Sequence, residues 1–313
     1  MIKFFIKKLR YMILILIGVS ILTFSLGRLA PGDPVQSILA DIDKPLTEEV
    51  IDDAREKMGL NKSIPQQYFI WLSGILKGDF GTCIKSGQKV TYEISRRIGP
   101  TIELTLASTI IMLLISFPLG ILSAVFKDRI PDRIIKFLNT VNISFPTFCV
   151  GIILILVLGV RMKLFPVMGR EGLKSLVLPS LTLGISMSGG LIRLIRNELL
   201  KNMEKDYVQT AVVLGVKKTS VVINNVILNS MIAIVTNVGL YIGALLGGST
   251  IIENLFGWPG LGNFMIQSIY NRDYAVIQAY AILMAVIYVV INMLVDMICY
   301  NLNPKMKGDS YGK

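Results

Sequence analysis

Leu104–Phe126 reads LTLASTIIMLLISFPLGILSAVF, a stretch of 23 residues without a charged side chain. A helix needs about 20 mainly apolar residues to cross the hydrocarbon core of a bilayer. The length and composition of this stretch therefore predict a transmembrane helix.

Five more uncharged runs repeat this pattern along the chain: Tyr11–Gly27, Phe137–Val160, Ser175–Ile192, Thr219–Ile252 and Tyr274–Val295. The fourth of these is too long for one crossing and carries three asparagines in its first third, so its span is expected near residues 230–250. A further run, 254–271, is rejected because it is rich in Asn, Gly and Gln and contains a proline. The prediction is an all-α integral membrane protein with six transmembrane helices. Five is the alternative, because Ser175–Ile192 is short and contains Pro179.

The composition agrees with a membrane protein. Of the 313 residues 53% are hydrophobic and 17% charged, and the mean hydropathy is +0.63. Soluble domains contain roughly 25% charged residues. The net charge of +11 suggests a nucleic-acid partner at first sight, but the charges lie almost entirely between the apolar runs. We therefore expect the lipid bilayer as a partner and no nucleic acid.

The distribution of Lys and Arg predicts the orientation. Segments 1–10, 127–136, 193–218 and 305–313 hold 17 Lys and Arg, whereas the opposite short loops, 161–174 and 253–273, hold five. Cytoplasmic loops carry the excess of Lys and Arg. Both termini are thus expected in the cytoplasm, as an even number of spans requires.

The first apolar run follows a basic tail, which is also typical of a cleaved signal peptide. No A-x-A-like site follows it, and Arg28 interrupts the expected cleavage region. We expect an uncleaved first helix. The three cysteines, Cys83, Cys149 and Cys299, fall at different predicted depths, so neither a disulfide nor a metal cluster is expected.

The apolar runs lack the residues that membrane chemistry uses. They contain no ionisable carboxylate or amine, and the chain has no His and no G-x-x-x-x-G-K-[ST] phosphate loop. No catalytic and no metal-binding residue is therefore predicted. We expect a passive pathway whose energy comes from another polypeptide. A stand-alone secondary transporter or channel is the alternative.

Residues 193–229 form the longest predicted cytoplasmic segment. Asp206 suits a helix N-cap, Gly215 suits a left-handed helix stop, and Thr219 or Ser220 could cap a second helix. Val208, Ala211, Val212 and Gly215 share one face of the first helix, which predicts a small apolar face exposed to water. Such a face usually binds a partner, although a solvated basic loop is also possible.

Several motifs of the chain resemble one known family, the permeases of bacterial dipeptide/oligopeptide/nickel ABC importers. Thr210-Ala211-x-x-x-Gly215 is similar to its "EAA" coupling loop. The other matching motifs are Ala30-Pro-Gly-Asp-Pro34, Gly78-Asp-Phe-Gly81, Pro100-Thr-x-Glu103, Ser144-Phe-Pro146, Phe165-Pro166, Leu178-Pro179 and Glu253-x-x-Phe256-x-Trp258-Pro259-Gly260-x-Gly262, followed by Asn271-Arg-Asp-Tyr274. Two departures are Ala233, where the family usually has Pro, and Asn303-Pro304 in place of Asp-Pro.

The resemblance implies a type I ABC importer permease with an extracytoplasmic insertion after the first helix. Residues 1–30 would be the N-tail and first helix, 31–100 the insertion, and 303–313 a cytoplasmic tail. Residues 101–302 would form a five-helix core with a coupling loop at about 197–228. Within the insertion, the sequence predicts helices near Thr47–Met58 and Pro65–Leu76.

The resemblance also implies the partners. The chain would work in the bacterial plasma (inner) membrane beside a homologous second permease, two ATPase subunits and an extracytoplasmic substrate-binding protein. It would hold no cofactor itself, because ATP and Mg would bind to the ATPases. The cargo would be peptides or nickel and other metal chelates. Since nickel favours imidazole ligands and the chain has no His, nickel would have to travel as a chelate.

Two groups of site residues follow from the resemblance. The ATPase-coupling group is Asp206, Tyr207, Thr210, Ala211 and Gly215. The second group would form an outer gate or a docking surface for the binding protein, with a rigid connector as the alternative: Glu253, Phe256, Trp258, Pro259, Gly260 and Gly262. Arg193 and Arg196 are expected to anchor the inner end of the fourth span by snorkelling, rather than to bind a phosphate-rich partner.

Overall fold

The computed structural model describes residues 2–29 and 61–302. Its regular elements in these ranges are helices, and β-type pairing is limited to an isolated bridge between Thr82 and Lys89. The all-α prediction is confirmed for this part of the chain. The motif at Ala30–Pro34, the helix expected at Thr47–Met58 and the tail 303–313 lie outside the described residues.

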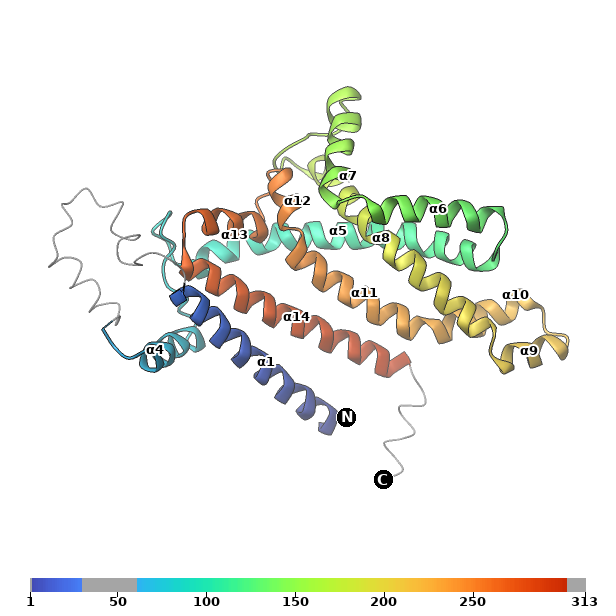
Figure 1. The fold of residues 1–313 in the computed structure, drawn as a ribbon, viewed down its shortest axis with the longest axis horizontal. Helices are drawn as coiled ribbons and strands as arrows, with labels where there is room; N and C mark the ends of the chain where they lie inside the picture. The colour runs from blue at the N-terminus through green and yellow to red at the C-terminus, as the bar shows by residue number, and fades with distance from the viewer. Residues whose placement is uncertain (1, 30–60, 303–313) are drawn as a thin grey trace. The chain divides into compact units, whose positions relative to one another are not determined.

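Figure 1 labels the helices by the names used below. Their bounds are α1 (Ile2–Leu29), α4 (Ile64–Leu76), α5 (Val90–Val125), α6 (Ile130–Ser144), α7 (Thr147–Leu154), η1 (Ile155–Arg161), α8 (Leu173–Met203), α9 (Asp206–Val213), α10 (Lys218–Val221), η2 (Val222–Ile227), α11 (Leu228–Gly248), α12 (Thr250–Leu255), α13 (Leu261–Tyr270) and α14 (Tyr274–Leu302). The elements η1 and η2 are π-helical turns that continue α7 and precede α11. The helix expected near Pro65–Leu76 is confirmed as α4.

Five helices in the described residues are long and apolar enough to cross a membrane: Arg10–Leu29, Val90–Val125, Leu173–Met203, Asn225–Gly248 and Tyr274–Asn301. A sixth crossing exists if α6 and α7–η1 count as one broken span. The rejected run 254–271 contains the last two residues of α12 and the short α13. The predicted six spans are present if this bent pair is one span. The reason given for the alternative of five is wrong, because Ser175–Ile192 lies in the candidate span Leu173–Met203, and the uncertain crossing is Phe137–Val160 instead.

The third predicted span, Phe137–Val160, is not a single helix. The limbs Ile130–Ser144 and Thr147–Arg161 meet at an angle of 99°. Phe145 between them is extended, with φ −86° and ψ 130°. Proline disfavours the helical conformation in the residue before it and has no N–H to donate to the preceding turn, so Pro146 explains the break.

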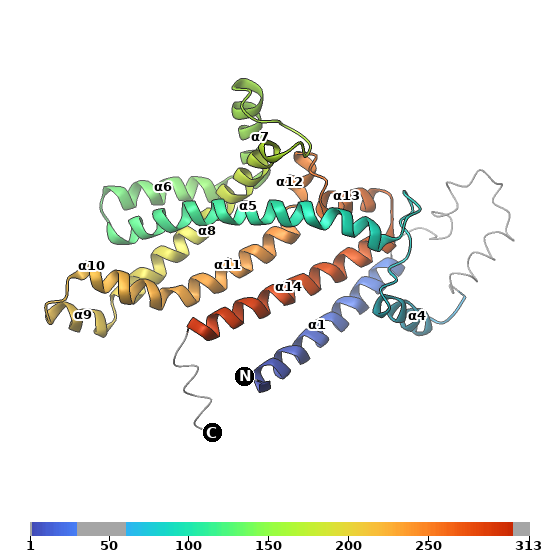
Figure 2. The same cartoon turned by 180° about the vertical axis from the view of Figure 1, so that it is seen from behind.

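The chain divides into two compact units. Unit 1 comprises residues 1–99 and 264–287, and unit 2 comprises residues 100–263 and 288–313. In unit 1, α4 packs against α1 (Figures 1 and 2). A second cluster in this unit buries Cys83, Val90, Phe264 and Val276. This cluster joins the segment 83–90 to α13 and to the start of α14.

Unit 2 is built around α8, which contacts α6, α7 and α11 (Figure 2). Small residues allow this close approach. A Cβ on Gly184 would lie 2.6 Å from Ile111 of α5, and one on Gly189 would lie 2.6 Å from Ile143 of α6. Asn142 of α6 also donates a hydrogen bond to the carbonyl oxygen of Ile185, at 2.8 Å. Small residues and interhelical hydrogen bonds are the usual means of packing helices in membranes.

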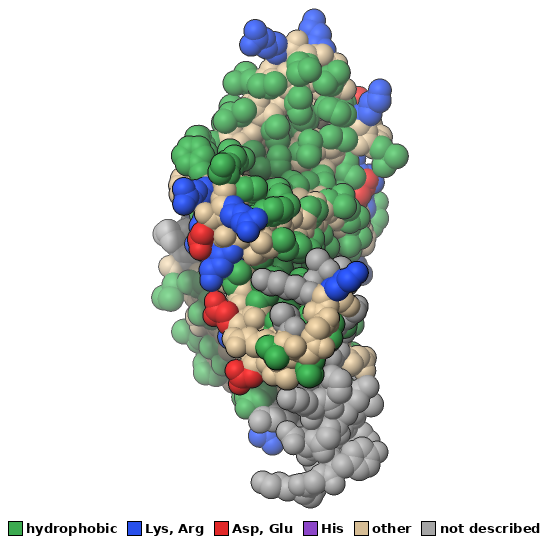
Figure 3. All heavy atoms as spheres, turned by 90° about the vertical axis from the view of Figure 1, so that its right-hand side faces the viewer, with side chains coloured by type: hydrophobic (Ala, Val, Ile, Leu, Met, Phe, Trp, Pro, Cys, Tyr) green, Lys and Arg blue, Asp and Glu red, His purple; other side chains and the backbone are tan. Residues whose placement is uncertain are grey.

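Many large apolar side chains are exposed. Figure 3 shows hydrophobic side chains over much of the visible face, with Lys and Arg gathered in groups between them. Examples from the long helices are Leu14, Leu22, Leu114, Phe137, Leu240 and Val290. A soluble monomer rarely exposes contiguous apolar surface to this extent, so the surface agrees with contact to lipid or to other membrane subunits.

Candidate functional site

The short helix α9 and the turn after it carry the predicted coupling residues. Asp206 is the first residue of α9, where a carboxylate stabilises the positive end of the helix dipole. The residue before it, Lys205, accepts the Val208 N–H at 2.9 Å and so occupies the cap position. The prediction of Asp206 as the N-cap is therefore wrong by one residue.

The predicted helix stop at Gly215 is confirmed. Gly215 has φ +86°, and the N–H of Val216 donates to the carbonyl oxygen of Ala211 at 3.1 Å. A left-handed glycine with this six-residue hydrogen bond is a Schellman motif. The next helix, α10, begins at Lys218, and Lys217 accepts the N–H of Val221. Thr219 and Ser220 therefore lie inside the first turn and are not N-caps.

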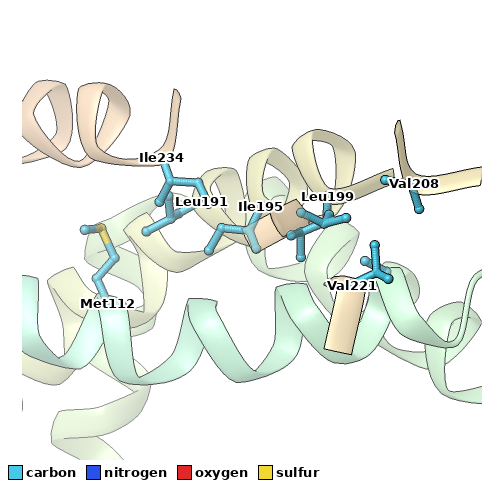
Figure 4. Packing of buried hydrophobic residues seen from close by; sticks show 9 residues of the cluster. Met112, Leu191, Ile195, Leu199, Val208, Val221 and Ile234 are labelled. Carbon is cyan, nitrogen blue, oxygen red and sulfur yellow. The ribbon is translucent and has the colours of Figure 1, made fainter. Parts of the chain in front are cut away.

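The apolar face of α9 is not exposed as predicted. Val208 is buried together with Leu199 of α8 and Val221 of α10 (Figure 4), and Ala211 is partly buried against the same cluster. The prediction considered only the loop, whereas this face packs on helices of the same chain. The cluster fixes the orientation of α9 relative to α8 and α10.

An exposed apolar surface exists one turn later. Val213 is 86% exposed and Leu214 is 77% exposed, and Val216 is also exposed. Val213, Leu214, Gly215 and Val216 are called the α9 tip below. The sequence signal for the tip is the pair Val213-Leu214 directly before the helix-ending glycine.

The other predicted coupling residues lie earlier in α9, and Asp206 and Tyr207 lie in its first turn. The Asp206 and Thr210 residues are exposed, and the Thr210 hydroxyl donates to the Asp206 carbonyl oxygen at 2.9 Å. The hydroxyl of Tyr207 accepts a hydrogen bond from Asn229 Nδ2 at 3.1 Å. Tyr207 thus ties α9 to the start of α11.

A buried ion pair that sequence reasoning missed lies in the same unit. Asp132 of α6 is fully buried, and Arg196 of α8 binds both of its carboxylate oxygens, at 2.9 and 2.8 Å. Ser123 at the end of α5 also donates to Asp132, and the N–H of Asp128 does so at 2.9 Å. The half-exposed Lys136 lies 3.1 Å from the same carboxylate.

This network joins the ends of three helices close to the predicted cytoplasmic side. Arg196 therefore does not snorkel to the interface, so the expected anchoring role is wrong for this residue; Arg193 is exposed. From the sequence, Asp132 falls in the basic cytoplasmic loop predicted at 127–136. Its partner is 64 residues away, so no local pattern marks the pair.

The segment 253–262 of unit 2 is held by buried hydrogen bonds. Glu253 is 0% exposed and accepts hydrogen bonds from Thr101 Oγ1 (2.8 Å), Ser249 Oγ (3.1 Å) and the Asn263 N–H (3.0 Å). The indole N–H of Trp258 donates to the Pro100 carbonyl oxygen at 2.9 Å.

Of the six residues predicted for the outer gate or docking surface, only Pro259 is exposed. Phe256 and Trp258 are buried in a cluster with Leu104 and Leu178, and a Cβ on Gly260 would collide with the Glu253 carboxylate. These contacts favour the rigid connector among the interpretations of this segment.

Unit 1 contains a polar pocket of about 240 Å³, lined by Cys83, Lys85, Ser86, Glu93, Arg97, Phe264, Gln267, Ser268, Asn271 and Asp273. Its carboxylates already have partners. Asp273 accepts the N–H of Ile84 at 2.7 Å and that of Val276 at 3.3 Å, and Glu93 pairs with Arg97. No group of three potential metal ligands was found in residues 2–29 and 61–302.

Comparisons with known proteins relate nearly the whole chain to transport permeases. The family profile described as "Binding-protein-dependent transport system inner membrane component" matches residues 116–308, and the profile for the N-terminal part of such membrane components matches residues 1–113. The glutathione transport system permease protein GsiC of Pectobacterium atrosepticum is 37% identical over 307 residues, which cover 98% of this chain and 99% of that protein. GsiC of Escherichia coli (strain K12) is 36% identical over the same coverage.

Solved structures show the same fold. A chain of the MetNI methionine ABC transporter in an inward-facing conformation matches with a TM-score of 0.59 at 18% identity, covering 68% of this chain and 97% of that chain. A chain of an amino acid ABC transporter matches with a TM-score of 0.55 at 15% identity, covering 67% and 94%.

Proposed function

This chain belongs to the family of binding-protein-dependent transport system inner membrane components, and from that premise we propose that it forms half of the translocation pathway of an ATP-driven importer. It is a permease subunit of an ABC importer, and its relatives are transport permeases rather than enzymes. The other half of the pathway would come from a homologous second permease.

The α9 tip is the proposed contact with an ATPase subunit. Its apolar side chains are exposed, while Val208 packs with Leu199 of α8 and so holds the first turn of α9 in place. A fixed base with an exposed apolar end is suited to insertion into a groove on a partner. This arrangement is the single observation that carries the coupling proposal, and it shifts the emphasis from Ala211 to Val213 and Leu214.

The other components of the proposed importer would be separate chains. Two ATPase subunits would bind ATP and Mg, and this chain would hold no cofactor. An extracytoplasmic binding protein would deliver the cargo. Both termini would lie in the cytoplasm, in agreement with the excess of Lys and Arg in the same set of loops.

The segment 253–262 would serve as a fixed wall of the outer gate. Its buried hydrogen bonds to Thr101 and Pro100 connect it to the start of the membrane-spanning part of α5. Pro259 is its exposed residue and would be the point that a docked binding protein could reach.

The proposed cargo is a small peptide. The relatives are named for glutathione transport, and glutathione is a tripeptide. A nickel or other metal chelate is the alternative cargo within the same transport mechanism.

Reconstituted uptake tests the function. The chain would be purified with its second permease and ATPases, placed in proteoliposomes and supplied with a binding protein and labelled glutathione, a dipeptide or a nickel chelate. We expect uptake of a peptide that requires ATP. Uptake of the nickel chelate alone would overturn the cargo, and uptake by the lone chain without nucleotide would show a stand-alone transporter or channel instead.

A further inference from the structure

The helix α4 of unit 1 is well defined at both ends but has no buried residue. At its start the Ser63 N–H donates to Gln66 Oε1 at 3.3 Å, which is one half of a capping box. At its end Gly78 has φ +81°, and the Asp79 N–H donates to the Gly74 carbonyl oxygen at 2.9 Å. Its 13 residues include no charged side chain. A helix of this length is marginal in water without tertiary packing.

One face of α4 contacts α1. The hydroxyls of Tyr68 and Ser20 hydrogen-bond at 2.8 Å, and the Trp71 ring lies 5.5 Å from the ring of Phe24. Figures 1 and 2 both show α4 beside the carboxyl end of α1. Ser20 and Phe24 lie within the candidate span Arg10–Leu29. A helix that contacts a membrane-spanning helix at these residues lies at the depth of the lipid.

A second apolar face of α4 is mostly exposed in the described residues. Pro65, Phe69, Leu72 and Leu76 recur at i, i+4, i+7 and i+11 and so form one stripe. Phe69 is 66% exposed and Leu76 is 80% exposed, while Leu72 is half-buried. Gln67 precedes Phe69 by two residues and therefore lies on the opposite side of the helix.

We propose that α4 lies in the membrane interface, with the Pro65–Leu76 stripe among the lipid acyl chains and Gln67 toward the headgroups. Leu22 and Leu26 of α1 are also exposed, on the side of α1 that faces away from Ser20 and Phe24, as expected for a helix surrounded by lipid. Lys62 and Lys77 flank the helix and are exposed, which places ammonium groups where lipid phosphates lie. Interfacial helices combine such an apolar stripe with Trp, Phe and Leu anchors.

Site-specific fluorescence in proteoliposomes tests this placement. Phe69→Cys and Gln67→Cys would be made in the full chain with Cys83, Cys149 and Cys299 replaced by Ala, labelled with the environment-sensitive dye NBD, and reconstituted in phosphatidylethanolamine and phosphatidylglycerol. Two quenchers would be compared: phosphatidylcholine with a nitroxide on its acyl chain, and aqueous iodide. No binding protein or ATPase is present.

We expect the dye at position 69 to be quenched by the lipid nitroxide and to be roughly threefold less accessible to iodide than the dye at position 67. Leu76→Cys on the same stripe should behave like Phe69→Cys, and it provides the test if the first variant does not fold. Free access of iodide to positions 69 and 76 would overturn the proposal and point to a protein partner for this face. Equal lipid quenching at 69 and 67 would contradict the proposed orientation. The inference is independent of ATP coupling, so either result leaves the proposed function standing.

Discussion

Gly215 ends α9 in the left-handed region, and a Cβ built there would meet no heavy atom within 4 Å. Asp and Asn both tolerate left-handed backbone better than other non-glycine residues. Gly215→Asp should therefore fold and insert normally. It should still reduce ATP-driven uptake by at least about tenfold, because the carboxylate of the new Asp would be buried against the ATPase.

Two controls separate the charge from the backbone. Gly215→Asn has nearly the same shape without the charge and should retain more uptake. Gly87→Asp places the same residue at another open glycine with φ +64°, and should leave uptake unchanged. Normal uptake by Gly215→Asp, measured at equal membrane abundance, would show that the turn does not contact the ATPase.

The Asp132–Arg196 pair makes a prediction about stability. Arg196→Ala leaves a fully buried carboxylate without its main partner, which typically costs about 3–5 kcal/mol. Lys136→Ala removes a half-exposed partner of the same carboxylate and should cost less than about 1 kcal/mol. Thermal unfolding of the two variants in detergent measures the difference. Similar small shifts in both would mean that Arg196 does not hold Asp132.

Gly215 and the Asp132–Arg196 pair differ in how far the sequence alone predicts their roles. Gly215 could be predicted because a helix stop depends on neighbouring residues. The ion pair could not, because its partners lie on different helices and each is surrounded by other charges. Val208 was assigned to the wrong surface for the same reason: its partner Leu199 belongs to another helix.

At the scale of elements, the break between α6 and α7–η1 is attributed to Pro146. Pro146→Ala restores an N–H and relieves Phe145, so the two limbs should straighten at least in part. Spin labels at the exposed positions Ile134 and Val160 would then move from about 25 Å apart toward about 40 Å, at 1.5 Å per residue. An unchanged distance would show that packing against α8, rather than the proline, maintains the bend.

The elements themselves were largely predictable. Long uncharged runs locate the spans because length and hydropathy are local properties, and the end signals of α4 lie within its own sequence. The absence of charge does not reveal the break in Phe137–Val160, which depends on Pro146 inside the run. For segment 253–262 the sequence leaves an outer gate, a docking surface and a rigid connector open, because the partners that bury Glu253 and Trp258 lie far away in the chain, at Thr101 and Pro100.

At the scale of the whole molecule, partners decide what the fold can do. The apolar runs lack ionisable side chains, and a channel can share this property with a permease. The motif resemblance and the permease relatives are what separate the two classes. In the proposed importer the pathway would lie between this chain and a second permease, so its geometry would depend on both chains. The α9 tip would be the part of this chain that contacts the proposed ATPase.

Photo-cross-linking from the α9 tip tests this central claim most directly. A photoreactive residue would replace Leu214 in the assembled importer, with the exposed Val160 on η1 as a matched control position. The account predicts that position 214 cross-links to an ATPase subunit and that position 160 does not. Absence of ATPase cross-links from position 214 in an importer that transports with ATP would contradict it.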